Sequence, residues 1–394
     1  MRIGIDARTI LNPKRGEAVG SGHYTYQLIK HLLDLDKENE YVLFFDFRAR
    51  EKDIKKFTRP NTKILFYPFS DYRKYLPGAY NEILTAATLA KEKLDILHST
   101  SPVSRIPTTY RGKTIATFHD MAIYKIPECF PKTTLVRSRV SYQLMANKVD
   151  KIIAVSNSIK DDLDNIFKVG NKTEVIYSGL DKRFFNGINA GAERILGKLE
   201  LDRKYILFLG TIEPSKNITR MLQAFADFKN KIVIKNIKED KGKKFDYKLL
   251  LVGKSGWLAK EYLQIAKDLK IKKDVVFAGY IIGDELLPLF KNAEFFILPS
   301  LYEGFGMTLL EAFATGTPAI VSKVSSLAEI GNDAAYFVNP IDVGGIAEAM
   351  FNFSQDKNMR EEFSKKGLER AKDFDWEAVA QKTLSVYKEI NSNK

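Results

Sequence analysis

The sequence has little of the material that builds disulfide scaffolds or metal centres. Its 394 residues include one cysteine, Cys129, and four histidines, at positions 23, 31, 98 and 119. A single cysteine excludes an intramolecular disulfide, and the histidines do not follow the spacing of zinc ligands. We therefore predict no bound metal, and we interpret Cys129 as a structural or surface thiol.

Long apolar runs are also missing. The most apolar stretches, such as residues 295–298, have the length of a strand, whereas a helix that spans a bilayer needs about 20 apolar residues. The chain starts with MRIGIDAR, which resembles a strand and lacks the features of a secretory signal. These absences predict a cytoplasmic protein that does not cross a membrane.

Positive charge is in excess. Lysine and arginine outnumber aspartate and glutamate by 62 to 49, a net charge of +13, which favours anionic partners such as nucleic acid, acidic membrane surfaces or phosphorylated ligands. A basic nucleic-acid-binding protein is one alternative. That hypothesis expects a clustered basic stripe with interleaved aromatic residues, and here the charges are spread along both halves of the chain.

Alternating strand and helix patterns predict two α/β domains, because a chain of this length exceeds what one hydrophobic core usually supports. Strands are expected at residues 2–6, 41–46, 63–67, 96–98, 114–117, 151–155 and 174–177, and again at 205–209, 249–252, 275–278, 295–298, 319–321 and 335–338. The expected domains are 1–185 and 200–375, followed by a helix over 376–394 that packs back towards the N-terminal domain. Residues 230–248 are lysine-rich and are interpreted as a solvated loop extension before a core strand.

The sharpest motif is Glu303-Gly-Phe-Gly-Met-Thr-Leu-Leu-Glu311, which follows an apolar strand and opens a helix. Glycines let the backbone approach a ligand, and the helix N-terminus attracts a diphosphate. At about 1.5 Å per helical residue the two carboxyl groups stand roughly 10 to 12 Å apart. This spacing is too long for a paired-carboxylate hydrolase and suits two hydroxyl-bearing parts of one extended ligand. The alternative is one glutamate before a helix and one solvated helix glutamate.

Four weaker motifs accompany it. They are Gly20-Ser21-Gly22, Phe118-His119-Asp120, Ala154-Val155-Ser156 and Gly210-Thr211-Ile212-Glu213-Pro214-Ser215-Lys216-Asn217. Taken singly, the glycines could mark a flexible loop, and His119-Asp120 could be a helix entry near a cap. In this order, and with the Glu303-x7-Glu311 motif, the chain resembles the retaining glycosyltransferases of the family 4 type, which include sucrose and glycogen synthases and bacterial mannosyltransferases.

The resemblance implies a GT-B fold: two Rossmann-like domains with parallel sheets facing across a cleft, the first binding the acceptor and the second the nucleotide-sugar. It implies that Glu303, His119 and Lys216 are catalytic. Glu303 would hold the hydroxyls of the transferred sugar, Glu311 the donor ribose, and Lys216 the diphosphate, while His119 would lie beside the donor sugar. The donor-binding set that it implies is Gly20, Gly22, Gly210, Ser215, Lys216, Gly304, Phe305, Gly306, Met307, Thr308 and Glu311.

The chain departs from the family pattern at Thr211 and Ser215, where the family commonly has arginine. Diphosphate neutralisation then depends on Lys216, with support expected from Arg220 and from Lys254 in Val252-Gly253-Lys254-Ser255-Gly256-Trp257. The missing arginines motivate a third hypothesis, a catalytically silent or epimerase-type nucleotide-sugar-binding protein of the same fold.

The Gly-Thr-x-Glu-Pro-x-Lys-Asn element resembles bacterial mannosyltransferases that build surface polysaccharides such as lipopolysaccharide. It implies a hexosyltransferase that uses GDP-mannose and a glycan or lipid-linked acceptor, with no separate cofactor; UDP-sugars and dTDP-rhamnose remain open as donors. Peripheral contact with the anionic inner face of the membrane would use basic side chains. The candidates are Arg73, Lys74, Lys91, Lys93, Arg137, Arg139 and Lys148.

Overall fold

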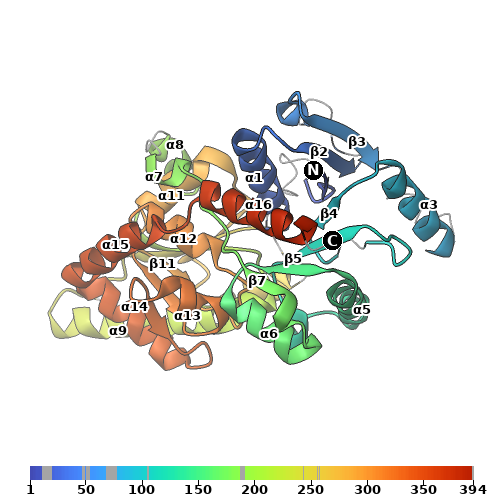
Figure 1. Cartoon of the computed structure of the whole chain (residues 1–394). Helices are drawn as coiled ribbons and strands as arrows, with labels where there is room; N and C mark the ends of the chain where they lie inside the picture. Colours follow the sequence, from blue (N-terminus) through green and yellow to red (C-terminus); the bar gives the residue numbers. More distant parts are fainter. Residues whose placement is uncertain are drawn as a thin grey trace. The chain divides into compact units, whose positions relative to one another are not determined.

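The computed structural model describes residues 1–10, 20–46, 49, 54–67, 78–103, 106–186, 191–242, 244–254, 256 and 258–392 (Figure 1). The chain forms two compact units. Unit 1 contains Met1–Tyr124, Pro131–Gly179 and Asp375–Lys394, and unit 2 contains Lys125–Phe130 and Leu180–Phe374. The chain therefore passes into unit 2 after Gly179 and returns to unit 1 for its last helix.

Unit 1 is built on one parallel sheet. Its strands are β1 (Arg2–Asp6), β2 (Glu40–Asp46), β3 (Thr62–Tyr67), β4 (Ile96–Ser99), β5 (Lys113–Phe118), β6 (Lys151–Ala154) and β7 (Thr173–Val175), in the order β3-β2-β1-β4-β5-β6-β7. The order reverses between β1 and β4, and ligands of doubly wound sheets bind at the carboxyl ends of strands at such a point.

The helices of unit 1 lie between these strands and after them. They are α1 (Ser21–Leu35), α3 (Gly78–Lys91), α4 (Ala122–Lys125), α5 (Lys132–Lys148), α6 (Asn157–Phe167) and α16 (Trp376–Ser392). The Ser156 hydroxyl caps α6 by accepting a hydrogen bond from the Ile159 N–H at 3.2 Å. Along α16, Trp376, Val386 and Tyr387 are buried, and this face packs against α1 (Figure 1).

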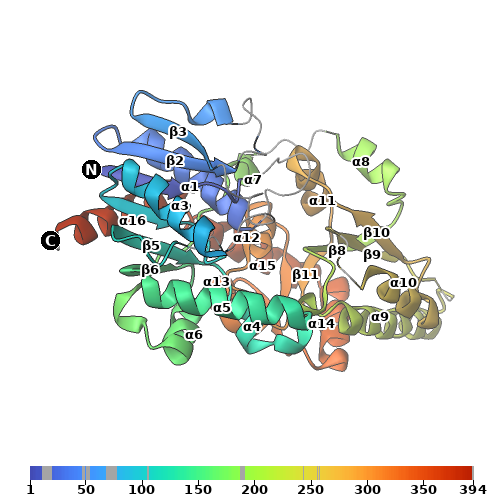
Figure 2. The same cartoon turned by 90° about the vertical axis from the view of Figure 1, so that its right-hand side faces the viewer.

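Unit 2 repeats the same topology. Its strands are β8 (Lys204–Leu209), β9 (Tyr247–Val252), β10 (Val275–Gly279), β11 (Phe295–Leu298), β12 (Ala319–Ser322) and β13 (Tyr336–Val338), in the order β10-β9-β8-β11-β12-β13. Figure 2 shows β8 to β11 of this sheet. Reversal of the order between β8 and β11 makes this the corresponding point for a ligand in unit 2.

The helices of unit 2 lie between these strands and after them. They are α7 (Arg183–Asn186), α8 (Ala192–Lys198), α9 (Ile218–Lys238), α10 (Ala259–Asp268), α11 (Leu286–Lys291), α12 (Met307–Ala314), α13 (Ser325–Gly331), α14 (Val343–Gln355) and α15 (Lys357–Ala371). A short 3-10 helix, η6 (Pro214–Lys216), precedes α9. Helix α9 packs against α14, and α12 against α15.

The interpretation of residues 230–248 as a loop extension is wrong for residues 230–238 and 247–248, which belong to α9 and β9. Helix α9 continues to Lys238, because Phe225, Phe228 and Ile232 extend one buried stripe while the lysines occupy the remaining face. Lysine is a good helix former, so a lysine-rich run does not by itself end a helix. The polar segment 181–203 likewise contains α7 and α8, which the pattern of apolar residues did not predict.

Candidate active site

Lys216 and Glu303 come together where β8 and β11 lie side by side. Lys216 ends η6 after β8, and Glu303 lies in the loop after β11. The Lys216 Nζ donates to the Glu303 Oε1 at 2.7 Å, and the two side chains are only 18% and 13% exposed. Each charge is thus offset by the other within a partly desolvated loop cluster, where an isolated charge would be costly.

The Glu303 carboxylate is held in one orientation by its neighbours. The Ser300 hydroxyl donates to the same Oε1 at 2.8 Å. The Glu303 N–H donates to the Ser325 hydroxyl at 3.0 Å, and the Ser326 hydroxyl donates to the Glu303 carbonyl at 2.8 Å. Ser300 of the loop and Ser325 and Ser326 at the start of α13 therefore restrain both the backbone and the side chain of Glu303.

The segment that carries Lys216 is fixed to the same loops. The Leu301 N–H donates to the Ser215 carbonyl at 2.8 Å, and the Asn217 side-chain amide donates to the carbonyls of Pro299 at 3.0 Å and Pro340 at 2.6 Å. Asn217 has a φ of 60°, a left-handed conformation that asparagine tolerates better than most residues. The loops after β8, β11 and β13 are joined by these bonds.

Helix α12 starts beside Glu303 with a backbone suited to an anion. Gly306 precedes it with a φ of 102°, and a Cβ there would come within 2.9 Å of the Leu327 Cδ2. Gly304 and Phe305 are buried, and Met307 and Thr308 are half-buried. In the described part of the chain no side chain caps the first turn of α12, so the positive end of the helix dipole is left for a ligand.

Glu311 lies in the second turn of α12. Its burial raises the pKa of the carboxyl group to about 8, an effect opposed by Arg183 and reinforced by Asp181. Because the shift favours the neutral form, most Glu311 carboxyls are protonated at pH 7. A perturbed carboxyl beside a helix N-terminus is typical of binding sites.

The other expected donor-binding residues of unit 2 lie around this cluster. The Ser215 hydroxyl donates to the Glu213 carboxylate at 2.7 Å, and an Arg220 Nη1 donates to the Asn217 side-chain carbonyl at 3.1 Å. Gly210 follows β8 and Gly253 follows β9, and the two lie so close together that a Cβ on Gly253 would be 1.8 Å from the Gly210 carbonyl oxygen. Lys254, which follows, is exposed, as is Thr211; Ser255 and Trp257 lie outside the described residues.

In unit 1, Gly20 and Gly22 do not share a loop. Gly20 is exposed and precedes α1 with a φ of 62°, whereas Gly22 is buried within the first turn of the helix. The alternative of a flexible loop therefore does not hold for Gly22, because α1 begins at Ser21, and donor binding by the two glycines stays a prediction. A left-handed conformation at the helix entry still favours glycine at position 20.

His119 follows β5 and is oriented by the main chain. Its Nε2 lies 2.7 Å from the carbonyl oxygen of Thr100. A carbonyl only accepts, so Nε2 carries the proton and the neutral ring keeps an acceptor lone pair on Nδ1. Burial lowers the pKa of His119 to about 4, so the ring is neutral at pH 7. Asp120 also acts as a cap, since its carboxylate accepts a bond from the Ala122 N–H.

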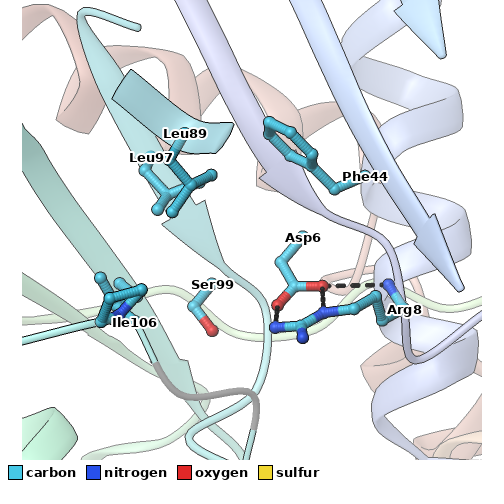
Figure 3. A pocket seen from close by; sticks show the side chains of 8 residues that line it. Asp6, Arg8, Phe44, Leu89, Leu97, Ser99 and Ile106 are labelled. Atoms are coloured by element: carbon cyan, nitrogen blue, oxygen red, sulfur yellow. Dashed lines mark hydrogen bonds and ion pairs between the residues drawn. The ribbon is translucent and has the colours of Figure 1, made fainter. Parts of the chain in front are cut away.

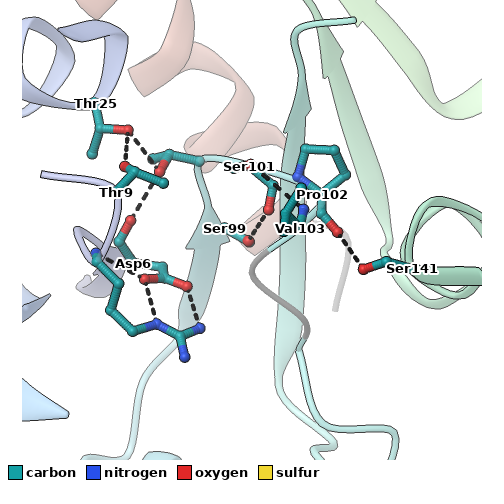
Figure 4. A network of polar contacts seen from close by, with 10 residues as sticks. Asp6, Thr9, Thr25, Ser99, Ser101, Pro102, Val103 and Ser141 are labelled. Carbon is teal, nitrogen blue, oxygen red and sulfur yellow. Dashed lines mark hydrogen bonds and ion pairs between the residues drawn. The ribbon is translucent and has the colours of Figure 1, made fainter. Parts of the chain in front are cut away.

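A polar network at the carboxyl ends of β1 and β4 was not predicted from the sequence. The Thr100 hydroxyl donates to the Asp6 carbonyl at 2.8 Å and accepts from Thr25 at 2.8 Å (Figure 4). The Ser99 hydroxyl donates to the Ser101 carbonyl at 3.0 Å. The network fixes Thr100, whose carbonyl orients His119. The signal available was the hydroxyl-rich run at residues 99–101 directly after a short apolar strand.

Next to this network is a small pocket (Figure 3). Its polar wall is the Asp6–Arg8 pair, in which the guanidinium donates to both carboxylate oxygens, at 2.9 and 2.6 Å. The remaining lining residues are Phe44, Leu89, Leu97, Ser99, Ile106 and Pro107. The pocket thus combines a charged pair with an apolar wall at the carboxyl edge of the sheet.

None of the described helices is both long and apolar enough to cross a membrane. Within the described ranges, no group of three or more His, Cys, Asp or Glu side chains is arranged to hold a metal ion. Cys129 is buried, and burial raises the pKa of its thiol.

Comparisons with known proteins agree with this architecture. The family model described as "Glycosyl transferases group 1" matches residues 193–370, and the model described as "Glycosyltransferase Family 4" matches residues 19–184. A relative from Escherichia coli, "O-antigen chain mannosyltransferase B", is 29% identical over 385 residues, covering 95% of this chain and 97% of the relative.

Solved structures show the same fold. Sucrose-phosphate synthase from Thermosynechococcus elongatus aligns with a TM-score of 0.75 at 20% identity, over 100% of both chains. Anabaena HepE, solved in complex with UDP and glucose, aligns with a TM-score of 0.75 at 16% identity, over 99% of this chain and 100% of HepE. The fold is therefore that of the GT-B glycosyltransferases, as predicted. The chain belongs to glycosyltransferase family 4, and it is a glycosyltransferase enzyme.

Proposed function

We propose that the protein is a retaining hexosyltransferase that transfers mannose from GDP-mannose to a glycan or lipid-linked acceptor in surface polysaccharide synthesis. The observation that carries the proposal is the Lys216–Glu303 pair at the start of α12. It combines a cation for a diphosphate with a carboxylate for sugar hydroxyls. The choice of mannose is supported by the E. coli relative, which is named an O-antigen mannosyltransferase.

In the proposed reaction the acceptor oxygen attacks the anomeric carbon on the face that the diphosphate leaves. The bond from that carbon to the acceptor oxygen forms, the bond to the phosphate oxygen breaks, and a diphosphate oxygen takes the acceptor's proton. Lys216 and the first turn of α12 stabilise the charge that develops on the diphosphate. Glu311 binds the ribose hydroxyls, and Glu303 binds those of the sugar.

His119 contributes as a hydrogen-bond acceptor in this proposal. Its Nε2–H is engaged by the Thr100 carbonyl, which leaves Nδ1 to accept a bond from a hydroxyl of the donor sugar. Its low pKa keeps the ring neutral, so protonation does not abolish this acceptor above pH 5.

Thr211 and Ser215 leave the diphosphate site with less positive charge than the family commonly has. Arg220 is bonded to Asn217, whereas Lys254 is exposed after β9, next to the strand that leads to Lys216. We assign Lys254 the supporting role, because an exposed lysine can reach a ligand without giving up an internal bond.

The donor is tested by thermal-shift and calorimetric binding with GDP-, UDP-, dTDP- and ADP-sugars. A ligand that binds only the folded protein raises its stability by mass action, about 2.7 kcal/mol at a hundred times Kd. Stabilisation by GDP-mannose, and a transfer product whose anomeric NMR coupling matches that of the donor, are the expected results. A response to another nucleotide alone overturns the choice of donor, and an inverted product overturns the retaining mechanism.

We propose that the acceptor glycan binds unit 1 in the Asp6–Arg8 pocket. A charged pair offers hydrogen bonds to sugar hydroxyls, and the apolar wall suits the C–H face of a sugar ring. Asp6→Asn is expected to raise the KM for acceptor and leave donor binding unchanged.

We propose that α5 docks on an anionic membrane surface. Val136, Val140 and Leu144 recur every four residues on its solvent face and are 68%, 45% and 44% exposed. The exposed cations Lys132 and Arg137 border this stripe, and α5 contains no acidic residue. An apolar stripe flanked by cations complements the interface of an anionic bilayer.

The basic residues that the sequence predicted to contact lipid fall into three groups. The Arg139 guanidinium donates to the Ile123 carbonyl, and the Lys148 Nζ donates to the Tyr110 carbonyl at 2.6 Å, so these two contribute to the fold. Arg137, Lys91 and Lys93 are exposed. Arg73 and Lys74 lie outside the described residues.

Docking is measured by sedimentation with vesicles of phosphatidylglycerol and phosphatidylcholine or of phosphatidylcholine alone. Val136→Asp with Val140→Asp should weaken binding to the anionic vesicles about tenfold or more, since two apolar side chains no longer leave water. Ile341→Asp is the matched control, because Ile341 is 65% exposed in unit 2. Equal binding by all three proteins, or a change only in self-association, contradicts the proposal.

A further inference from the structure

Three aromatic side chains of unit 1 pack in series from His119 to the last helix. Tyr24 of α1 meets the His119 ring edge to face, with ring centroids 4.6 Å apart at 73°. Trp376, the first residue of α16, meets Tyr24 at 5.5 Å and 63°. Tyr24 is 2% exposed and Trp376 is 1% exposed, so neither ring has space to turn without displacing the other.

Trp376 is itself held on two further sides. His31, two turns after Tyr24 on α1, stacks on the indole with centroids 6.1 Å apart at 19°. Gly179 leaves room for it, because a Cβ at that position would lie 2.5 Å from the Trp376 backbone nitrogen and 2.6 Å from the indole Cγ. Among the described residues the buried Trp376 Nε1 has no hydrogen-bond partner. The indole therefore holds its neighbours by packing against the Tyr24 and His31 rings, without a hydrogen bond among the described residues.

His119 needs such support because, among the described residues, one hydrogen bond restrains its ring. The bond from Nε2 to the Thr100 carbonyl fixes one corner of the imidazole, and a single hydrogen bond leaves the ring able to rotate about it. The Tyr24 edge removes this freedom by packing. The direction in which Nδ1 points is then set by Tyr24, and the position of Tyr24 is set by Trp376.

We propose that Tyr24 and Trp376 are positioning residues, which hold the His119 imidazole in the orientation that transfer requires. The inference rests on the proposed role of His119 in the reaction. It gives α16 a role in catalysis through α1, although no residue of α16 is assigned to the donor or the acceptor. A misplacement of about 1 Å in a group that orients a reactant can lower a rate a hundredfold.

The other groups near His119 must be distinguished in any titration. His98 of β4 is fully buried, with Nδ1 2.7 Å from the Tyr387 hydroxyl and Nε2 2.8 Å from the Thr117 hydroxyl. Burial lowers the pKa of His98 to about 3, and the neighbouring His119 contributes. Tyr24 faces His119 from α1, and burial raises the pKa of Tyr24 to about 12. Tyr24 therefore stays neutral below pH 9, and a titration must separate the signal of His119 from those of His98 and of His31, which stacks on Trp376.

The kinetic test compares three variants of the full-length protein. Trp376→Leu removes the ring contact, Trp376→Phe keeps an aromatic ring, and Ile390→Ala removes a buried side chain near the other end of α16. Trp376→Leu should lower kcat about ten- to hundredfold with an unchanged Kd for nucleotide. Trp376→Phe should restore most of kcat, and Ile390→Ala should lower only the Tm. Equal kcat in Trp376→Leu and Ile390→Ala, at a temperature where both are folded, overturns the proposal.

A second readout does not depend on activity. The chain has four histidines, so histidine side-chain NMR can follow His119 individually. Loss of the indole should admit water and raise the pKa of His119 from about 4 towards its usual value near 6.5. The shift is expected in Trp376→Leu and not in Trp376→Phe or Ile390→Ala. A pKa that stays low in Trp376→Leu overturns the proposal even if the protein transfers no sugar, whereas a missing wild-type activity overturns the proposed function alone.

Discussion

Lys216 and Glu303 are each other's partner in a site proposed to hold a diphosphate and a sugar. Their separation of 2.7 Å means that a bound diphosphate would compete with Glu303 for the lysine. The ion pair therefore keeps both charged groups in place before the donor arrives. Bringing the two charged groups out of water costs free energy. The Ser300 hydroxyl lowers this cost by donating a hydrogen bond to the same carboxylate oxygen at 2.8 Å.

A double-mutant cycle tests whether the pair acts as a unit. Lys216→Ala and Glu303→Gln should each lower kcat about 10²- to 10³-fold, because each removes charge stabilisation at the reacting group. Residues that act together give non-additive losses, so the double variant should be no slower than about the slower single variant. Ser300→Ala is the control and should lose less than tenfold. Losses that multiply in the double variant would show that the two side chains act independently.

Glu311 makes donor binding depend on pH. Its pKa of about 8 means that the free protein carries the protonated form at pH 7, whereas ribose hydroxyls bind better to the carboxylate. Affinity for GDP should therefore rise with pH, by up to about tenfold from pH 7 to pH 9, as the competent fraction grows. Titration calorimetry in buffers of different ionisation enthalpy measures the proton released.

Glu311→Gln is the matched control for this dependence, because the amide has nearly the same shape and does not titrate. The variant should show only the pH dependence of the nucleotide itself. If wild type and variant change in parallel with pH, ionisation of Glu311 is not linked to binding.

At the residue scale, local motifs made the Glu303 to Glu311 segment and Lys216 candidates for the site, because glycines and carboxylates at a strand-to-helix turn carry their own chemical signal. They did not predict that Lys216 bonds to Glu303, which is 87 residues away. That contact follows from the adjacency of β8 and β11, which no local pattern records. Asp6 and Arg8 were missed for a similar reason, since a charged pair after a strand looks like an ordinary turn.

At the scale of elements, the backbone just after β8 and the backbone just after β9 lie close together at Gly210 and Gly253. Gly253→Ala would place a methyl group 1.8 Å from the Gly210 carbonyl oxygen, so the strand ends must separate. Forced overpacking of this kind costs typically 1 to 3 kcal/mol, occasionally more, and the shift should also displace the loop that carries Lys216. Chemical denaturation and calorimetric nucleotide binding measure the two effects.

Gly279→Ala is the comparison for Gly253→Ala. Gly279 ends β10 with a φ of 71°, and a Cβ there would meet nothing within 4 Å. Only the backbone cost of about 1 to 2 kcal/mol applies, and nucleotide binding should be retained. Equal losses of stability and binding in both variants would contradict the role given to close strand packing.

Apolar periodicity predicted the strands of both sheets and the last helix, because a parallel strand covered on both faces leaves a short continuous apolar run. It failed for the second half of α9. There the buried residues Phe228 and Ile232 alternate with many lysines, and a lysine-rich run predicts a solvated loop. Composition described the exposed face of the helix and said nothing of the face that packs on α14.

At the scale of the whole molecule, the chain does not complete its units in sequence order. Unit 2 is nearly continuous from Leu180 to Phe374, whereas unit 1 takes its last helix from the end of the chain. In α16, Trp376, Tyr387 and Ile390 are buried, and each large buried side chain contributes about 2 to 5 kcal/mol. Their sum is comparable to the stability of a typical domain, about 5 to 15 kcal/mol.

A chain that ends at Phe374 should therefore keep unit 2 and lose the stable fold of unit 1. Limited proteolysis with mass spectrometry is expected to leave a protected fragment close to residues 180–374 that still binds nucleotide. The full-length protein under the same conditions is the control and should protect both units. Equal protection of unit 1 with and without α16 would contradict the expectation.

The return of α16 to unit 1 has a consequence for synthesis on the ribosome. Translation proceeds at about 5 to 20 residues per second, so the segment from Leu180 to the C-terminus takes roughly 10 to 40 s to appear after the first sheet has emerged. During that interval the face of α1 that carries Tyr24 and His31 is without Trp376. The unit that begins first is finished last, so a nascent chain exposes this aromatic surface to chaperones until α16 has emerged.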